Sequence, residues 1–448
     1  MKRLLLLSIV FINNIADAQS IVKKDPSIER MVAEISADSL KSYVEAMVSF
    51  GTRNTLSEQD NPQRGIGAAR NWVLNKFNSF NVGNKRKLIT YIDTTTLQPD
   101  KHRVDVPTLL GNVLAILPGA DTADKRIFLI GGHLDNMRGN VMDRAGDAPG
   151  ANDDASGVAA TLECARILGN SSFPASIYFV AFSGEEQGLL GAHFMAEKMK
   201  KQAISIEAVL NNDMIGNNNT SETGIIENTR VRVFSEGLPA FETEKEAATI
   251  RALGLENDGN SRQLARYLKE TGERYVENIN VVLIYRNDRF LRGGDHTAFV
   301  QRGFTAVRLC EMNENYRYQH QDVKIENGVE YGDLLKFMDF EYLRKNTAVN
   351  LATLANLAKA PAKPAKVKME VKKLGNNTKL SWQQPAGTRV SGYYVLARET
   401  SSPIWQRKIY TTNSEMNLPL SKNNYFFAVQ SVSAEGNESL PVVPTVQR

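Results

Sequence analysis

Carboxylate and imidazole side chains follow several of the apolar runs in this chain. One run ends at His133, with Asp135 two residues later, and a second is followed by Ser-Gly and the adjacent pair Glu185 and Glu186. A third run ends in Asn-Asn and is followed by Asp213. Such side chains are typical zinc ligands, and they also act as general acids and bases. Their repeated position after apolar runs indicates one site assembled from distant parts of the sequence.

The two adjacent glutamates are the sharpest of these signals. Because neighbouring backbone positions point in different directions, one of Glu185 and Glu186 can bind a metal while the other faces a reacting water. The alternative is that both lie at a helix N-terminus, where negative charge is favourable.

A second acidic pair, Asp153 and Asp154, precedes a helix-like stretch over residues 156–168. An aspartate at this position can cap the helix by accepting hydrogen bonds from its first backbone N–H groups. A carboxylate there can also bridge two cations through its two oxygens. Both interpretations stay open, one for each aspartate.

Two of the five histidines, His296 and His320, compete for the last ligand position. His296 lies in the motif Gly-Gly-Asp-His, and His320 ends the motif Tyr-Arg-Tyr-Gln-His. A mixture of hard oxygen donors and imidazoles suits zinc, with cobalt or manganese as possible substitutes.

The elements that position these side chains alternate between short β-rich runs and helix-like stretches from about residue 86 to residue 310. This alternation predicts an α/β fold with a mostly parallel mixed sheet flanked by helices. Sites in such sheets lie at the carboxyl ends of the strands. Helices are expected over residues 25–50, 64–80 and 334–358, and residues 216–259 resemble an insertion or lid.

A linker is predicted at residues 360–365, Ala-Pro-Ala-Lys-Pro-Ala, which separates a domain over residues 19–359 from a second one over 366–448. The second region has close-spaced short strands, which are typical of a small all-β sandwich. Its Leu-Ser-Trp motif at Trp382, with Tyr-Tyr-Val-Leu from Tyr393, resembles a fibronectin type III module. Such modules serve as spacers, surface binders or stabilising appendages, so contact with a surface or another protein stays open.

Residues 1–18 have a basic start, a short apolar run and an Ala-x-Ala site, as in a signal peptide, so we expect an exported protein, periplasmic or extracellular. No later segment has the ~20 apolar residues that a membrane span needs. A net charge of +4 over 448 residues gives no case for nucleic-acid binding. Cys164 and Cys310 are expected to be free, inert thiols rather than a disulfide.

Taken together, these motifs resemble the co-catalytic di-zinc exopeptidase family, which includes bacterial leucyl aminopeptidases, glutamate carboxypeptidase and glutaminyl cyclases. The resemblance covers about residues 30–358. It rests on the ordered set His-x-Asp, Gly-Ala-x-Asp-x-x-Ser-Gly, Ser-Gly-Glu-Glu-x-Gly, Asn-Asp-Met, and a late Asp-His followed by a His. It implies a zinc aminopeptidase-like fold with two zinc ions per chain.

The resemblance also implies residue roles. Asp153 corresponds to the carboxylate that bridges both zinc ions, His133 and Asp213 complete one metal site, and Glu186 and His320 complete the other. Glu185 corresponds to the general base, and Asp135 to the hydrogen-bond partner of the His133 ring.

The late histidine departs from the family pattern, in which a Tyr-His pair precedes an acidic residue by three or four positions. Here His320 follows Gln319, and Asp322 is only two positions later. His296 matches an Asp-His turn that borders the site without binding metal, so His320 is chosen as the ligand. Tyr316 or Tyr318 is a candidate for the phenol that steadies an oxyanion.

The function that the resemblance implies is a secreted zinc aminopeptidase, which hydrolyses N-terminal residues from peptides through a metal-bridging hydroxide. A single-zinc glutaminyl cyclase and a carboxypeptidase or dipeptidase are the alternatives within the family. The carboxypeptidase would need a cationic clamp, for which Arg286, Arg289 and Arg292 are candidates, although they are more simply solvated loop charges. A catalytically inactive binding protein is the remaining alternative.

Overall fold

A computed structural model describes residues 22–82, 87–100, 102–372 and 375–447. Its centre is an eight-stranded sheet with the order β1-β2-β4-β3-β5-β8-β6-β7. The pairs β3–β4, β3–β5, β5–β8 and β6–β7 are parallel, and the others are antiparallel. The predicted mostly parallel mixed sheet is therefore confirmed. Its strands are β1 (Ile89–Leu97), β2 (Thr108–Leu117), β3 (Ile127–His133), β4 (Ser176–Phe182), β5 (Ile206–Asn212), β6 (Arg230–Ser235), β7 (Asn280–Ile284) and β8 (Ala306–Glu311).

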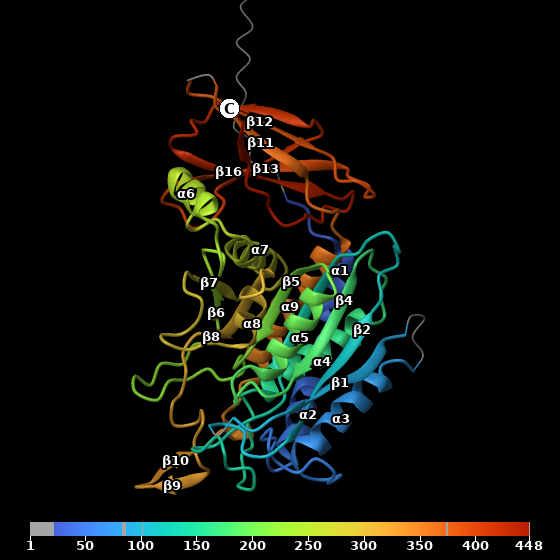
Figure 1. The fold of residues 1–448 in the computed structure, drawn as a ribbon, viewed down its shortest axis with the longest axis vertical. Coiled ribbons are helices and arrows are strands. Elements are labelled where there is room, and N and C mark those ends of the chain that lie inside the picture. Colours follow the sequence, from blue (N-terminus) through green and yellow to red (C-terminus); the bar gives the residue numbers. More distant parts are fainter. Residues whose placement is uncertain (1–21, 83–86, 101, 373–374, 448) are drawn as a thin grey trace, which may run out of the picture.

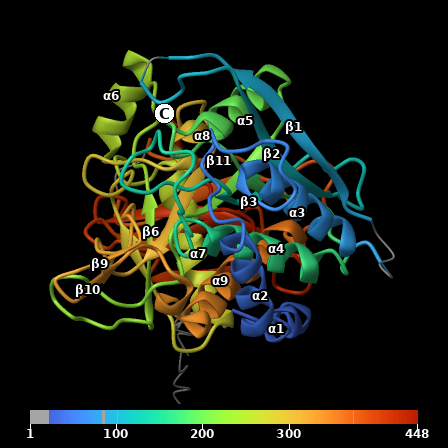
Figure 2. The ribbon, with the colours of Figure 1, turned by 90° about the horizontal axis from the view of Figure 1, so that it is seen from below.

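Helices cover both faces of this sheet (Figure 2). One face packs against α1, α2, α3, α4, α7 and α9 in a large apolar core, and the other packs against α5 and α8. The central strands are buried on both faces, which explains their nearly continuous apolar sequences. The helices are α1 (Pro26–Ala33), α2 (Ala37–Val48), α3 (Gly65–Ser79), α4 (Ala155–Leu168), α5 (Leu190–Lys201), α6 (Glu244–Leu253), α7 (Asn260–Tyr275), α8 (Asp295–Val300) and α9 (Phe340–Lys359), with a short 3-10 helix η1 (Leu335–Phe337).

Some predicted elements differ from those observed. The helix expected over residues 25–50 is interrupted, because the side chain of Ser36 accepts a hydrogen bond from Ser39 and begins α2 anew. Residues 216–259, expected as an insertion or lid, include sheet strand β6 and helix α6. A small hairpin of β9 (Lys324–Glu326) and β10 (Val329–Tyr331) follows His320 and was not predicted.

The C-terminal module (residues 365–447) lies at one end of the molecule, next to α6 and α7 (Figure 1). It contains a four-stranded sheet with the order β15-β12-β11-β17 and a three-stranded sheet with the order β14-β13-β16. An apolar core that includes Trp382, Tyr393 and Phe427 lies between them. The strands are β11 (Ala365–Glu370), β12 (Thr378–Gln383), β13 (Gly392–Glu399), β14 (Arg407–Thr411), β15 (Glu415–Leu418), β16 (Tyr425–Val432) and β17 (Thr445–Gln447).

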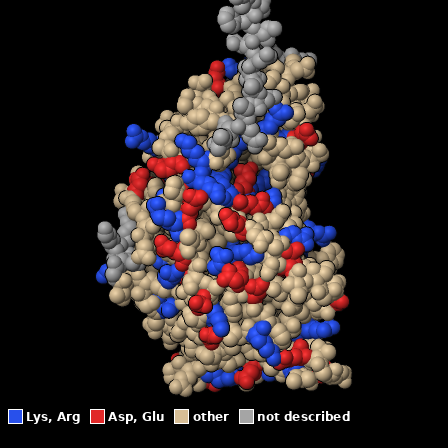
Figure 3. Space-filling model, turned by 180° about the vertical axis from the view of Figure 1, so that it is seen from behind, with Lys and Arg blue, Asp and Glu red and all other residues tan. Residues whose placement is uncertain are grey.

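Three further observations concern the surface and the thiols. Acidic and basic side chains are interspersed over the face shown in Figure 3, rather than separated into patches of one sign. Among the described helices, none has the length and apolar character needed to cross a bilayer. Cys164 and Cys310 are both buried and free, as expected.

Candidate metal centre

The predicted site residues converge at the carboxyl ends of three central parallel strands. His133 is the last residue of β3, Glu185 and Glu186 follow β4, and Asp213 is the first residue after β5. Asp153 lies just before α4. Because parallel strands end at the same edge of a sheet, residues far apart in the sequence meet there.

Two groups of possible metal ligands form at this edge. His133, Glu185 and Asp213 make one group, and the ligand atoms within it lie within 4.8 Å of one another. The second group meets the same limit and contains Asp153, Glu186 and His320.

Asp153 connects the two groups through its two carboxylate oxygens. Oδ1 lies 3.1 Å from Nε2 of His133, and Oδ2 lies 3.0 Å from Nε2 of His320. His320 Nε2 is also 3.2 Å from Oε1 of Glu186, and His133 Nε2 is 3.9 Å from Oδ1 of Asp213. This arrangement matches a carboxylate shared between two cation sites.

The electrostatics of the pocket also fit bound cations. Burial raises the pKa of Glu185 well above its ordinary value and also raises that of Glu186. Burial opposes ionisation of Asp153 as well, but hydrogen bonds from the two histidines lower its pKa well below the ordinary value. Oε1 of Glu186 is buried and accepts no well-formed hydrogen bond from any described residue. Buried carboxylates need compensating positive charge, and divalent cations held by imidazoles and carboxylates supply it.

The sequence left open which of the two adjacent aspartates caps α4. In the structure this residue is Asp154. It accepts hydrogen bonds from the backbone N–H groups of His133 (2.9 Å), Gly157 (2.9 Å) and Met214 (3.2 Å). One buried carboxylate thus joins the end of β3, the start of α4 and the turn after β5. The capping role belongs to Asp154, and the position between the histidines belongs to Asp153.

The contact made by Asp135 differs from the one expected. Nδ1 of His133 lies 2.9 Å from the backbone carbonyl oxygen of Asp135, but 3.8 Å from its carboxylate. The carboxylate accepts hydrogen bonds from the backbone N–H groups of Glu185 and Glu186, each at 3.2 Å, and from the Thr55 hydroxyl at 3.0 Å. Asp135 therefore holds the turn that carries both glutamates, and its backbone rather than its side chain contacts the ring.

The other candidate residues belong to neither ligand group. His296 is buried, and its Nε2 lies 2.7 Å from the carbonyl oxygen of Asn287, outside both ligand groups. Tyr316 is 54% exposed, and Tyr318 stacks on Phe337 with ring centroids 3.8 Å apart. Neither phenol lines the metal-site cavity, so the expected oxyanion role of these tyrosines is not supported.

Several supporting residues were missed in the sequence. Asp333 accepts backbone hydrogen bonds from Asn152 (2.9 Å) and Asp153 (2.7 Å), which orients the shared carboxylate. Arg308, fully buried in β8, forms ion pairs at 2.9 Å with both Asp213 and Asp288. A charged residue inside an apolar run, as Arg308 is, was the available signal. The sequence gives no such signal for Asp333, because its role depends on a tertiary contact.

The metal-site cavity has a volume of about 520 Å³ and opens beside the ligands. Its lining includes Glu185, Asp213 and His320, together with Arg103 and Arg292. A ligand of several residues' size can therefore reach both ligand groups and a positively charged wall.

The family description Peptidase family M28 matches residues 112–339, which contain both ligand groups. The chain belongs to peptidase family M28. It is 40% identical to a probable zinc metalloprotease of Leptosphaeria maculans, over 94% of this chain and 97% of that protein. A probable zinc metalloprotease of Pyrenophora tritici-repentis is 38% identical, over 94% of this chain and 98% of that protein.

This M28 chain is therefore a zinc metallopeptidase. Among solved structures it resembles LapA of Legionella pneumophila, an aminopeptidase, with a TM-score of 0.52, 20% sequence identity, and coverage of 80% of each chain. At this identity the likeness establishes the fold alone, and it agrees with the observed mixed sheet flanked by helices.

Proposed function

We propose that the protein is an exported aminopeptidase that uses two zinc ions to remove N-terminal residues from peptides. The observation that carries this proposal is the position of Asp153 between two ligand groups in one open cavity. His133 and Asp213 would hold one ion, Glu186 and His320 the other, and Asp153 both. Zinc, when bound, polarises a substrate carbonyl and acidifies water.

Glu185 is the residue that we assign to proton transfer. It belongs to the first ligand group but is only half-buried, so water and substrate can reach it. Its backbone N–H is held by Asp135, which fixes the turn that carries it. Glu185 accepts a proton from the attacking water and passes it to the departing amine.

The first test combines zinc analysis with the Glu185→Gln variant. We expect two zinc ions per chain in both proteins and a fall in peptide turnover of at least about a hundredfold in the variant. Hydrolysis should require a free N-terminus, so N-acetylated peptides should stay intact. Retained activity in the zinc-loaded variant contradicts the assignment of Glu185, and one zinc with cyclisation of N-terminal glutamine indicates the cyclase instead.

A second candidate, a peptidase that recognises a substrate carboxylate, is favoured by the arginines of the cavity. Arg103 donates to the carbonyl of Glu186, and Arg292 contacts Gln319, but neither pairs with a carboxylate among the described residues. Arg289, by contrast, is occupied by Asp288 and Glu314. Guanidinium groups bind carboxylates through paired hydrogen bonds.

Dipeptides with free and amidated C-termini separate the two candidates. If the arginines bind a substrate carboxylate, amidation should raise KM about tenfold, and Arg292→Gln should abolish that preference. Arg286→Gln is the matched control, because Arg286 is exposed, lies on the same loop and does not line the cavity. Equal KM values for both dipeptides support the aminopeptidase without a carboxylate clamp.

Export and the nature of the C-terminal module are part of the same proposal. The expected signal peptide, residues 1–18, lies outside the described residues. The resemblance of the C-terminal module to a fibronectin type III domain is supported by its two small sheets around Trp382.

A further inference from the structure

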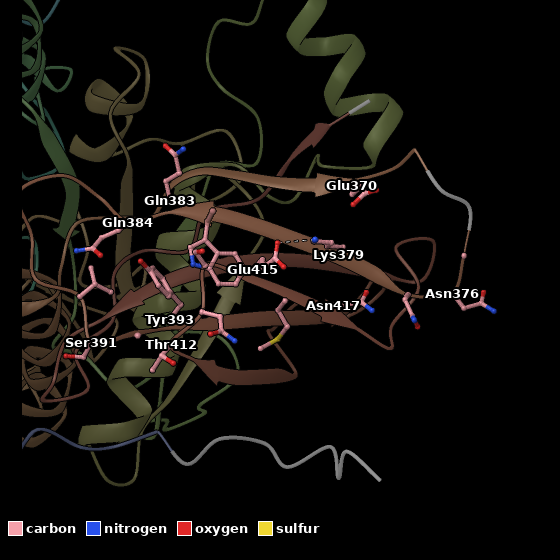
Figure 4. A pocket seen from close by; sticks show the side chains of 18 residues that line it. Glu370, Asn376, Lys379, Gln383, Gln384, Ser391, Tyr393, Thr412, Glu415 and Asn417 are labelled. Carbon is pink, nitrogen blue, oxygen red and sulfur yellow. Dashed lines mark ion pairs between the residues drawn. The ribbon is translucent and has the colours of Figure 1, made fainter. Parts of the chain in front are cut away.

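A hollow on the C-terminal module shares no lining residue with the metal-site cavity among the described residues. Its volume is about 1480 Å³, and it is bounded by β12, β15 and the residues that precede β13 (Figure 4). Lys379 of β12 is paired in register with Asn417 of β15, so the two side chains lie side by side on the solvent face of the sheet.

Neutral hydrogen-bonding groups dominate the lining of this hollow. Six exposed amide side chains line it: Asn376, Asn377, Gln383, Gln384, Asn413 and Asn417. Except for a 3.4 Å contact from Gln384 to a carbonyl, these amides make no side-chain hydrogen bond with any other described residue. Each amide offers both donors and an acceptor, so the surface is prepared for a ligand with many hydroxyl groups.

The charges in the hollow largely cancel. Lys379 forms an ion pair with Glu415 at 3.0 Å, which leaves Glu370 as the remaining charged side chain among the described residues of the lining. A polyanion would need a net positive wall, and an acidic peptide would need free cations. The lining therefore favours an uncharged ligand.

A buried aromatic pair borders the hollow. Trp382 and Tyr393 lie between the two sheets with ring centroids 5.4 Å apart, and Trp382 is only 4% exposed. Both rings are among the residues that line the hollow, so a bound ligand changes the surroundings of the Trp382 indole.

From these observations we propose that the hollow is a binding site for a neutral oligosaccharide. Sugar hydroxyls match the donors and acceptors of the amides. A peptide strand added to the edge strand β15 fits less well. This strand is only four residues long and presents Glu415 on its exposed face, and short charged edges oppose strand addition.

The site lies at the opposite end of the sheet from the metal centre. Arg126, just before β3, donates to the carbonyl oxygens of Ala360 (2.8 Å) and Pro361 (3.1 Å), so the chain enters the module at the amino ends of the strands. The metal ligands lie at the carboxyl ends. Carbohydrate bound to the module therefore leaves the peptidase cavity open, and it would hold the enzyme on a glycan-coated surface.

Affinity electrophoresis of the full chain through gels that contain soluble β-glucan, xylan or galactomannan tests the proposal. We expect at least one of these polysaccharides to retard the protein. The double variant Gln383→Ala/Asn417→Ala should weaken the binding about tenfold and leave peptidase activity and thermal midpoint unchanged. Asn423→Ala, an exposed amide outside the hollow, is the matched control and should bind normally.

Tryptophan fluorescence gives a second measurement. Saccharide binding should alter the emission of the wild-type protein, because Trp382 lines the hollow, and the double variant should show no such change at the same saccharide concentration. Retardation by none of the three polysaccharides overturns the proposal, and so does equal binding by the double variant. Binding of a peptide at β15, without binding of any of the three polysaccharides, would also overturn the proposal.

Discussion

At the residue scale, the candidate metal centre depends on carboxylates that belong to neither ligand group. Asp154 and Asp135 hold the backbone turns around the ligands, and Asp333 holds the N–H groups of Asn152 and Asp153. Partners of this kind orient ligands and tune their affinity. The positions of the ligands therefore depend on three backbone turns, each of which is held by a carboxylate outside the ligand groups.

Asp333 offers the clearest test of this view. Burial raises its pKa to about 7, and it is the acceptor for both N–H groups next to the shared carboxylate. We expect Asp333→Asn to weaken zinc binding about tenfold, because outer partners of metal ligands have effects of about that size. Competition with a chromogenic chelator measures the affinity. Glu330→Gln, on the nearby hairpin, should bind zinc normally, and unchanged affinity in Asp333→Asn would sink the idea.

At the scale of elements, the sequence predicted a sheet flanked by helices, but it did not predict the order of the strands across that sheet. The continuous apolar runs of β3, β4 and β5 and the motifs after them were sufficient to place His133, Glu185, Glu186 and Asp213 at one edge. The order of strands across the sheet is set by tertiary packing that no local pattern records. The partners of Asp135 depend on the same packing, so the hydrogen bonds that its carboxylate accepts from Glu185 and Glu186 have no signal in the sequence.

The start of α4 is joined to two other segments by a single buried carboxylate. Asp154 accepts three backbone hydrogen bonds that join β3, α4 and the turn after β5. We expect Asp154→Ala to lower the free energy of unfolding by about 3 kcal/mol, at about 1 kcal/mol per hydrogen bond. Ser36→Ala removes the single capping bond of α2 and should cost only about 1 kcal/mol. Urea denaturation measures both free energies of unfolding. Equal losses in the two variants would show that Asp154 acts as an ordinary helix cap.

At the scale of the whole molecule, buried charges fasten the C-terminal module to the peptidase helices. The fully buried Glu438 accepts hydrogen bonds from Arg274 of α7 (3.1 Å) and Asn356 of α9 (3.1 Å), and pairs with Lys408 of β14 at 3.3 Å. A second link runs from Asp258 to Arg398 of β13 at 2.6 Å. The predicted linker therefore does not produce a loosely tethered module.

This attachment makes stability depend on the ionisation of Glu438. Burial alone would raise its pKa, but Arg274 and Lys408 outweigh burial and lower the pKa far below the ordinary 4.5. A carboxylate with a lowered pKa stabilises the fold fully above its ordinary pKa, and that stabilisation decreases as the pH falls towards the folded value. We expect Glu438→Gln to lose about 3 kcal/mol at pH 7, because it leaves buried cations without their counter-charge.

Urea denaturation of wild type and Glu438→Gln at several pH values measures this contribution. The difference between them should be constant above pH ~5 and should shrink below the ordinary pKa, because the wild-type carboxylate then begins to lose its advantage. Glu435→Gln, an exposed residue three positions earlier, should match wild type throughout. A difference that persists unchanged at pH 3 would mean that shape, not charge, joins the module to α7 and α9. Because the ion pairs cross between the two regions, their loss should lower the unfolding temperature of the peptidase region as well as that of the module.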